Sequence, residues 1–142
     1  MNKDTTTLPN IHVFAIRLKP GQDLKKELQS FVNKNKLSAA WIASAAGSLT
    51  TYQIRFANQP DVTKDSGHFE IVSLSGTLSQ NGSHIHISVS DSTGKTTGGH
   101  LADGCIIYTT AEIIIQSTDK YTFTRAKDGT TPWEELHIEE RR

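Results

Sequence analysis

Apolar and polar residues alternate in several short stretches of this chain, a pattern typical of β-strands that bury one face. Residues 11–18 predict the first strand, and we expect it to lie inside a sheet because both of its faces carry apolar side chains. Residues 69–78 predict a strand that precedes Asn81-Gly82, a pair that favours a tight hairpin turn. Residues 84–90 then form the return strand. Together these stretches predict a largely antiparallel sheet.

One stretch has the spacing of an amphipathic helix. Leu24, Leu28, Phe31 and Val32 occupy positions i, i+4, i+7 and i+8, so their side chains share one face of a helix. The preceding Asp23 is placed to cap this helix, because its carboxylate can accept hydrogen bonds from the free N–H groups of the first turn. The sequence therefore predicts one main helix that covers the sheet.

The remaining stretches are less distinctive. Residues 38–46 are small and apolar, and helix propensity favours a helix there, whereas the spacing of the neighbouring elements fits a strand that ends at Gly47. We expect a strand here, another over residues 49–57, and then a polar loop to about residue 67. The same alternation predicts further strands at residues 96–101, 105–108, 111–117 and 121–125.

The predicted fold belongs to the α/β class and is of the α+β type. It is one compact domain with a largely antiparallel sheet of about six to seven strands, covered by one main helix. Residues 1–9 are expected to be a disordered leader and residues 10–126 the domain. Residues 127–142 are expected to form a tail that is partly docked through Trp133.

Composition and charge narrow the classes of function. The 142 residues are 35% hydrophobic and 21% charged, and no apolar run approaches the roughly 20 residues that a membrane span needs. Fifteen Lys and Arg balance fifteen Asp and Glu, which predicts only weak nonspecific attraction to nucleic acid. The polar amino terminus lacks a secretory signal, so we expect a cytoplasmic protein. Cys105 is the single cysteine and is expected to be a buried, unreactive thiol.

Three histidines carry the most informative chemistry. Side chains alternate along a strand, so His84 and His86 point to the same face with Cα atoms about 7 Å apart. Two glycines precede His100 and allow its backbone to approach a neighbouring strand closely. Three imidazoles would hold a metal ion and leave a fourth coordination position open. The alternative is that these histidines simply form the solvated polar face of a strand. His12, His68 and His137 show no comparable grouping and are expected to be ordinary surface or core-edge residues.

Two carboxylates also stand out from their surroundings. Glu112 lies in the apolar segment of residues 110–115, where an unpaired buried carboxylate would be costly. It either pairs with a cationic side chain or a backbone donor, or it reaches a functional cavity. Glu70 poses the same question near the start of the predicted hairpin. Either carboxylate could orient a metal-bound histidine by accepting a hydrogen bond from its ring.

Four segments, taken in order, resemble the plant- and prokaryote-conserved domain family, called PPC or PCC. They read FEIVSLSG at residues 69–76, GSHIHISVSD at 82–91, GKTTGGHL at 94–101 and AEI at 111–113. The resemblance extends approximately over residues 11–125. This domain occurs alone in bacteria and archaea, and beside AT-hook motifs in plants.

The resemblance implies a compact α/β subunit with a largely antiparallel sheet, assembled as a homotrimer. It also implies that His84, His86 and His100 hold a divalent metal ion, usually taken as zinc, as in the stand-alone prokaryotic members. No Arg-Gly-Arg-Pro core of an AT-hook occurs in this sequence. A DNA-binding role therefore depends on the family association alone.

Two classes of function follow from these observations. In the first, the open coordination position binds a small-molecule ligand or activates water, with Glu70 or Glu112 as a base, which would make the protein a metalloenzyme. In the second, the domain is an association module of DNA-bound or other complexes, and its metal is structural. The sequence contains no Gly-x-Ser-x-Gly elbow, phosphate-binding glycine loop or His-Glu-x-x-His helix, so it identifies no substrate.

Overall fold

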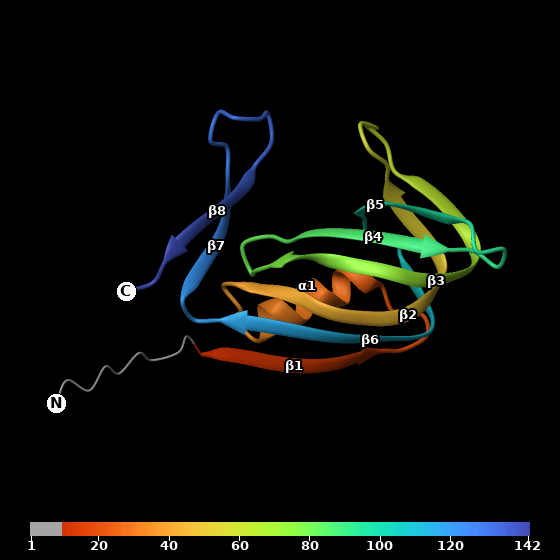
Figure 1. The fold of residues 1–142 in the computed structure, drawn as a ribbon, viewed down its shortest axis with the longest axis horizontal. Helices are drawn as coiled ribbons and strands as arrows, with labels where there is room; N and C mark the ends of the chain where they lie inside the picture. Colours follow the sequence, from red (N-terminus) through yellow and green to blue (C-terminus); the bar gives the residue numbers. More distant parts are fainter. Residues whose placement is uncertain (1–9) are drawn as a thin grey trace.

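The computed structural model describes residues 10–142, and in this part it contains one α-helix and eight β-strands (Figure 1). The expected leader, residues 1–9, lies outside the described residues. The elements are β1 (Ile11–Leu18), α1 (Leu24–Lys34), β2 (Ala40–Arg55), β3 (Thr63–Leu78), β4 (His84–Ser90), β5 (Thr96–Leu101), β6 (Ile106–Thr118), β7 (Tyr121–Ala126) and β8 (Glu135–Glu140). The 11-residue α1 is too short and too polar to cross a bilayer.

The first six strands form one antiparallel sheet in the order β1-β6-β2-β3-β4-β5, which confirms the predicted fold class. The sheet is strongly curved, because the end of β2 also pairs with β5 through Ile54 with Leu101 and Arg55 with His100. A register shift between Leu49 and Thr51 bends β2 on the way to this contact. Strands β2, β3, β4 and β5 therefore close on themselves at one end of the sheet.

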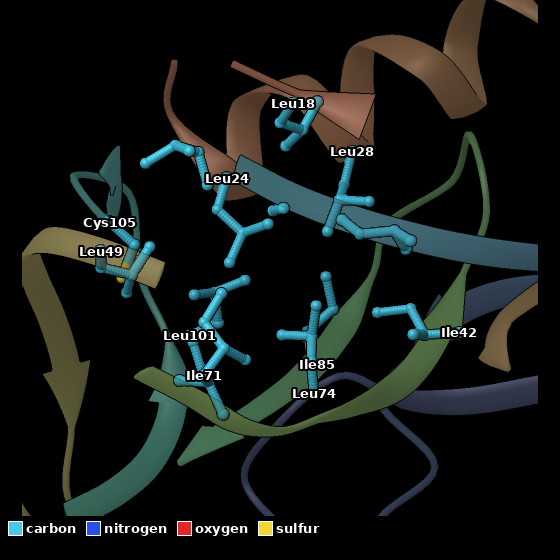
Figure 2. Close-up of a cluster of buried hydrophobic side chains, with 14 of the residues drawn as sticks. Leu18, Leu24, Leu28, Ile42, Leu49, Ile71, Leu74, Ile85, Leu101 and Cys105 are labelled. Carbon is cyan, nitrogen blue, oxygen red and sulfur yellow. The ribbon is translucent and has the colours of Figure 1, made fainter. Parts of the chain in front are cut away.

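Helix α1 covers one face of the sheet and supplies part of the core. Asp23 caps it as predicted: Oδ1 accepts a hydrogen bond from the Lys26 amide at 3.1 Å, and Oδ2 accepts one from the Gly104 amide at 2.8 Å. Leu24, Leu28 and Val32 are fully buried. Figure 2 shows Leu24 and Leu28 directed from α1 into the cluster that holds Ile71, Leu74 and Ile85 of β3 and β4.

Three strands are longer than the sequence pattern suggested. The predicted break at Gly47 is absent, and β2 runs without interruption from Ala40 to Arg55 because it pairs with β3 on one side and β6 on the other. A Cβ atom at Gly47 would collide with the backbone of β6, so this glycine serves close strand packing and does not end the strand. The two segments predicted at 105–108 and 111–117 likewise form the single strand β6. Strand β3 begins at Thr63, inside the expected loop.

The expectation that the first strand is interior was wrong. Strand β1 has the predicted bounds, but it lies at the edge of the sheet and pairs with β6 alone among the described strands. Phe14 faces α1 and meets Phe31 edge to face at 5.3 Å, whereas Ile11 and Val13 on the opposite face are 54% and 62% exposed. The apolar residues on both faces of β1 therefore reflect an exposed apolar surface on its outer face, and they do not indicate a central position in the sheet.

The carboxyl-terminal segment forms a separate hairpin of β7 and β8, which rises from the sheet in Figure 1. Its contact with the main sheet is through β7: the Phe123 carbonyl accepts hydrogen bonds from Ser79 Oγ at 3.1 Å and Asn81 Nδ2 at 3.0 Å. Trp133, the expected anchor, is 68% exposed. The hairpin is therefore held by polar bonds at its base while its tip projects outward.

Candidate metal centre

His84, His86 and His100 lie together on the outer side of β4 and β5. The strand period places His84 and His86 on one face of β4, while Ile85 and Ile87 between and after them are buried in the core. His86 and His100 are directly paired across the two strands. His84 Nε2 and His86 Nε2 are 3.1 Å apart, and the rings of His84 and His100 stack with centroids 5.1 Å apart. The structure thus brings together the three histidines that the sequence singled out.

Two glycines in β5 make this approach possible. A Cβ atom at Gly98 would lie 2.6 Å from the Ile87 carbonyl oxygen of β4, and one at Gly99 would lie 2.5 Å from the Arg55 carbonyl oxygen of β2. Distances this short are repulsive, so any larger residue would push β5 away from one of its two neighbours. The Gly98-Gly99 pair therefore fixes the position of His100 by letting the strand fit between β4 and β2.

The spacing of the three rings fits a single metal ion. One nitrogen atom of each ring lies within 4.8 Å of the corresponding atoms of the other two. Ligand nitrogens on one tetrahedral zinc ion are about 3.4 Å apart, given a Zn–N distance of about 2.1 Å. The 3.1 Å between His84 Nε2 and His86 Nε2 is close to this value. Imidazole nitrogen suits zinc, copper, iron and nickel, so the donor set is compatible with several transition metals.

The electrostatic surroundings of His84 and His100 favour the neutral form of both rings. Partial burial lowers the pKa of His84, and the neighbouring His86 and Arg125 lower it further. Burial also lowers the pKa of His100, with a second contribution from the positive charge of Arg55. A neutral imidazole has a free lone pair for a metal ion, whereas a protonated one has none. The site is therefore prepared for coordination at neutral pH.

The structure does not bring Glu70 and Glu112, the carboxylates expected to orient a metal-bound histidine, to the histidine cluster. Glu70 pairs with Ser90, which is four residues or about 13 Å along β4 from His86. Glu112 lies on β6, opposite Arg17 and Ala46, and β2 and β3 separate it from β4. Both glutamates are exposed, so neither has the desolvation cost that the apolar sequence around Glu112 suggested. Both side chains lie on the exposed outer face of the sheet.

The other expectations about reactive side chains agree with the structure. His12 contacts Asp119 at 2.9 Å and His137 contacts Glu139 at 3.4 Å, both on the surface. His68 is exposed beside Tyr108. Cys105 is fully buried, and burial raises the pKa of its thiol to about 11, so it is a packed and unreactive side chain.

A cleft of about 920 Å³ opens beside His84 and His100. Its walls come from the end of β2 with the loop that follows, from the β3–β4 turn, and from the carboxyl-terminal hairpin. Arg55, Arg125 and Trp133 line it. No local pattern marked the two arginines as functional residues, and Trp133 was expected only to anchor the tail. All three reach the cleft only through the β2–β5 pairing and the docking of β7 on the β3–β4 hairpin. The histidine cluster therefore borders a space large enough for a small molecule.

Comparisons with known proteins identify relatives of this chain. The chain is 45% identical over 130 residues to the bifunctional protein GlmU of Synechococcus sp. (strain JA-3-3Ab), covering 92% of this chain and 21% of that protein. It is 31% identical over 98 residues to the AT-hook motif nuclear-localized protein 13 of Arabidopsis thaliana, covering 65% of this chain and 22% of that protein. The chain thus spans about a fifth of the length of the curated relatives it matches.

Solved structures show the same fold. A hypothetical protein from Salmonella cholerae-suis matches with a TM-score of 0.92 and 41% identity, over 95% of this chain and 98% of that one. A metal-containing protein from Archaeoglobus fulgidus matches with a TM-score of 0.72 and 25% identity, over 89% and 93% of the two chains. The family model of the Plants and Prokaryotes Conserved (PCC) domain matches residues 6–119. The chain therefore belongs to the PCC domain family, as the four sequence segments indicated.

Proposed function

We propose that this PCC-domain protein binds one divalent metal ion, zinc in the first instance, through His84, His86 and His100, and that the ion's open position takes a small molecule. The observation that carries this proposal is the convergence of three imidazole nitrogens within 4.8 Å of one another. The relative from Archaeoglobus fulgidus, described as a metal-containing protein, supports it. Three protein ligands leave room for one more, as in catalytic zinc sites.

The chain's own residues define what such a site does. His86 and His100 form a rigid pair because their strands are in register, and Gly98-Gly99 keeps the pair close. His84 completes the ligand set at the edge of the cleft, so the cleft is the route for a small molecule. A bound zinc ion would supply Lewis-acid polarisation of that molecule or of a water. Neither Glu70 nor Glu112 lies beside the histidines, so neither is positioned to act as a base there.

The second candidate function is an association module for DNA-bound complexes, in which the metal is structural. The relationship to the AT-hook motif nuclear-localized protein favours it. The formal net charge of zero opposes direct binding, because nonspecific affinity for DNA comes mainly from cationic side chains on phosphates. We therefore place this function second.

We also propose that copies of the chain associate as a homotrimer. Helix α1 covers one face of the sheet, and the opposite face carries the exposed apolar side chains Ile11 and Val13 on the edge strand β1. An unpaired edge strand with apolar side chains is a template for association unless another chain covers it. A closed ring of identical subunits removes such an edge from solvent.

The metal proposal predicts the composition of purified, untagged protein. Elemental analysis should find about one zinc or similar ion per chain, and the double substitution His84→Ala and His86→Ala should abolish it, because one remaining imidazole cannot hold the ion. The matched control replaces His12 and His137 by alanine, since both are surface histidines outside the cluster. Full metal content in the His84 and His86 variant would refute the assignment.

Metal binding should also depend on pH in a defined direction. The lowered pKa values of His84 and His100 keep these rings unprotonated below the ordinary histidine value, so affinity should persist at pH about 6.5 and fall at lower pH. The fall should be steep, because more than one proton competes with the ion. Competition titrations against a zinc chelator, from about pH 8 to about pH 5, measure the affinity for zinc. Circular dichroism at each pH confirms that the chain stays folded, and an unchanged affinity throughout would contradict three-imidazole binding.

The trimer proposal predicts the mass in solution. Light scattering at micromolar concentration should give three times the chain mass of 15.6 kDa. Val13→Asp should reduce this mass, because it places a charge on the exposed apolar face of β1. Val62→Asp is the control, since Val62 is 43% exposed but lies outside β1. A monomeric wild-type chain would overturn the proposal.

The DNA alternative has its own test. An electrophoretic mobility assay with duplex DNA should show weak binding that disappears at near-physiological salt, because the chain has no excess of cationic residues. The assay compares random sequence with an A·T-rich duplex. Tight, sequence-dependent binding at that salt concentration would reverse the order of the two candidate functions.

A further inference from the structure

We propose that the cleft beside the histidines is a binding site for a small organic anion, whose carboxylate or phosphate group lies between Arg55 and Arg125 and whose planar apolar part packs on Trp133. The inference rests on the proposed function, because it names the class of molecule that the open position of the metal centre would take. In addition to the metal ion, Arg55 and Arg125 would provide a second point of attachment for this molecule, made only of protein side chains.

Arg55 is held directly beside the histidine cluster. It is the last residue of β2 and pairs in register with His100 of β5. Its Nη1 donates a hydrogen bond to the Gln59 carbonyl oxygen at 3.2 Å, which orients the guanidinium group and leaves its other N–H donors free for a ligand. The side chain is half-buried and lines the cleft.

Arg125 occupies the other side of the cluster. Its Nη2 donates a hydrogen bond to Thr77 Oγ1 at 3.0 Å, and Thr77 is the register partner of His84. Each arginine is thus tied to the strand position opposite one of the histidines. The positive charges of Arg55 and Arg125 also contribute to the lowered pKa values of His100 and His84, which agrees with their proximity to the rings.

The charges of both arginines are left without an acidic partner in residues 10–142. No carboxylate oxygen of this part of the chain lies within 4.0 Å of Arg55 or Arg125. Both guanidinium groups bond only to neutral oxygens and are half-buried. A planar guanidinium fork matches a carboxylate or phosphate group with two parallel hydrogen bonds. The two arginines therefore favour an oxyanion as the missing partner.

The acidic residues in the cleft limit the kind of anion. Glu134 and Glu135 line the same space from the hairpin, and Glu135 accepts a hydrogen bond from Thr131 Oγ1 at 2.6 Å. Glu135 pairs across the hairpin with Ala126, the neighbour of Arg125, so these carboxylates would repel a second negative group close to the arginines. They disfavour a polyphosphate or a nucleic-acid backbone and select a molecule with a single oxyanion group.

Trp133 supplies the apolar surface that such a molecule needs. Its indole lines the cleft and is 68% exposed. A large aromatic side chain left open at a cleft wall is suited to stacking on a planar group. Trp133 and Arg125 both lie beyond residue 119, where the match to the PCC family model ends. The hairpin thus adds ligand selectivity to a histidine site on the domain.

The test uses the zinc-loaded full-length chain and isothermal titration with phenyl phosphate, benzoate and inorganic phosphate. Phenyl phosphate and benzoate distinguish a preference for phosphate from a preference for carboxylate. At least one of them should bind more tightly than inorganic phosphate, because its ring can pack on Trp133. Arg55→Gln and Arg125→Gln should each weaken the preferred probe by about tenfold or more, the effect of losing a charged hydrogen bond. Arg142→Gln, at the chain end, is the charge-matched control and should leave binding unchanged.

Trp133→Ala should weaken the aromatic probe without changing the binding of inorganic phosphate, and Ile138→Ala on the same hairpin is its control because Ile138 is 54% exposed. Zinc content is measured for every variant, so that loss of the metal is distinguished from loss of anion binding. A wild-type chain that binds no metal refutes the metal proposal. The titration then tests the arginine site independently of the metal. The inference is overturned if no probe binds, or if the probes bind the two arginine variants as they bind the wild type.

Discussion

The double pairing of β5, with β4 on one side and the end of β2 on the other, is the constraint on which the site depends. It requires a strand without side chains at two successive positions, because a Cβ atom at Gly98 or Gly99 would be 2.6 or 2.5 Å from a carbonyl oxygen of a neighbouring strand. Once β5 fits there, His100 is fixed opposite both His86 and Arg55. Backbone packing thus sets the distance between imidazoles before any ion is considered.

The sequence was sufficient wherever a local period determines the structure. The bounds of β1, the cap at Asp23, the β3–β4 hairpin and the common face of His84 and His86 all follow from spacing within a few residues. The β3–β4 connection is nevertheless longer than the tight turn expected at Asn81-Gly82, because it spans residues 79–83. The sequence failed where pairing between distant strands decides the outcome. Gly47 was expected to end a strand, but pairing on both sides of β2 carries the strand through it.

Long-range pairing also explains what the sequence missed in the site. Arg55 ends an apolar strand and Arg125 lies in a short polar one, so neither has a local pattern that marks a functional residue. Their significance arises from the β2–β5 closure and from the hydrogen bonds that attach β7 to the β3–β4 turn. Glu70 and Glu112, which the apolar surroundings made conspicuous, lie instead on the exposed outer face of the sheet.

The balanced charge of the whole chain conceals an uneven local distribution. At the cleft, the guanidinium groups of Arg55 and Arg125 lie beside His84 and His100, whose lowered pKa values favour their uncharged forms and so add no further positive charge. If a divalent ion binds the imidazoles, its charge reinforces that of the arginines, because all of them border the same partly enclosed space. Glu134 and Glu135 of the hairpin line the same cleft and offset part of this positive charge. An oxyanion at the arginines would therefore strengthen metal binding, and a bound metal would strengthen the oxyanion site to the same extent.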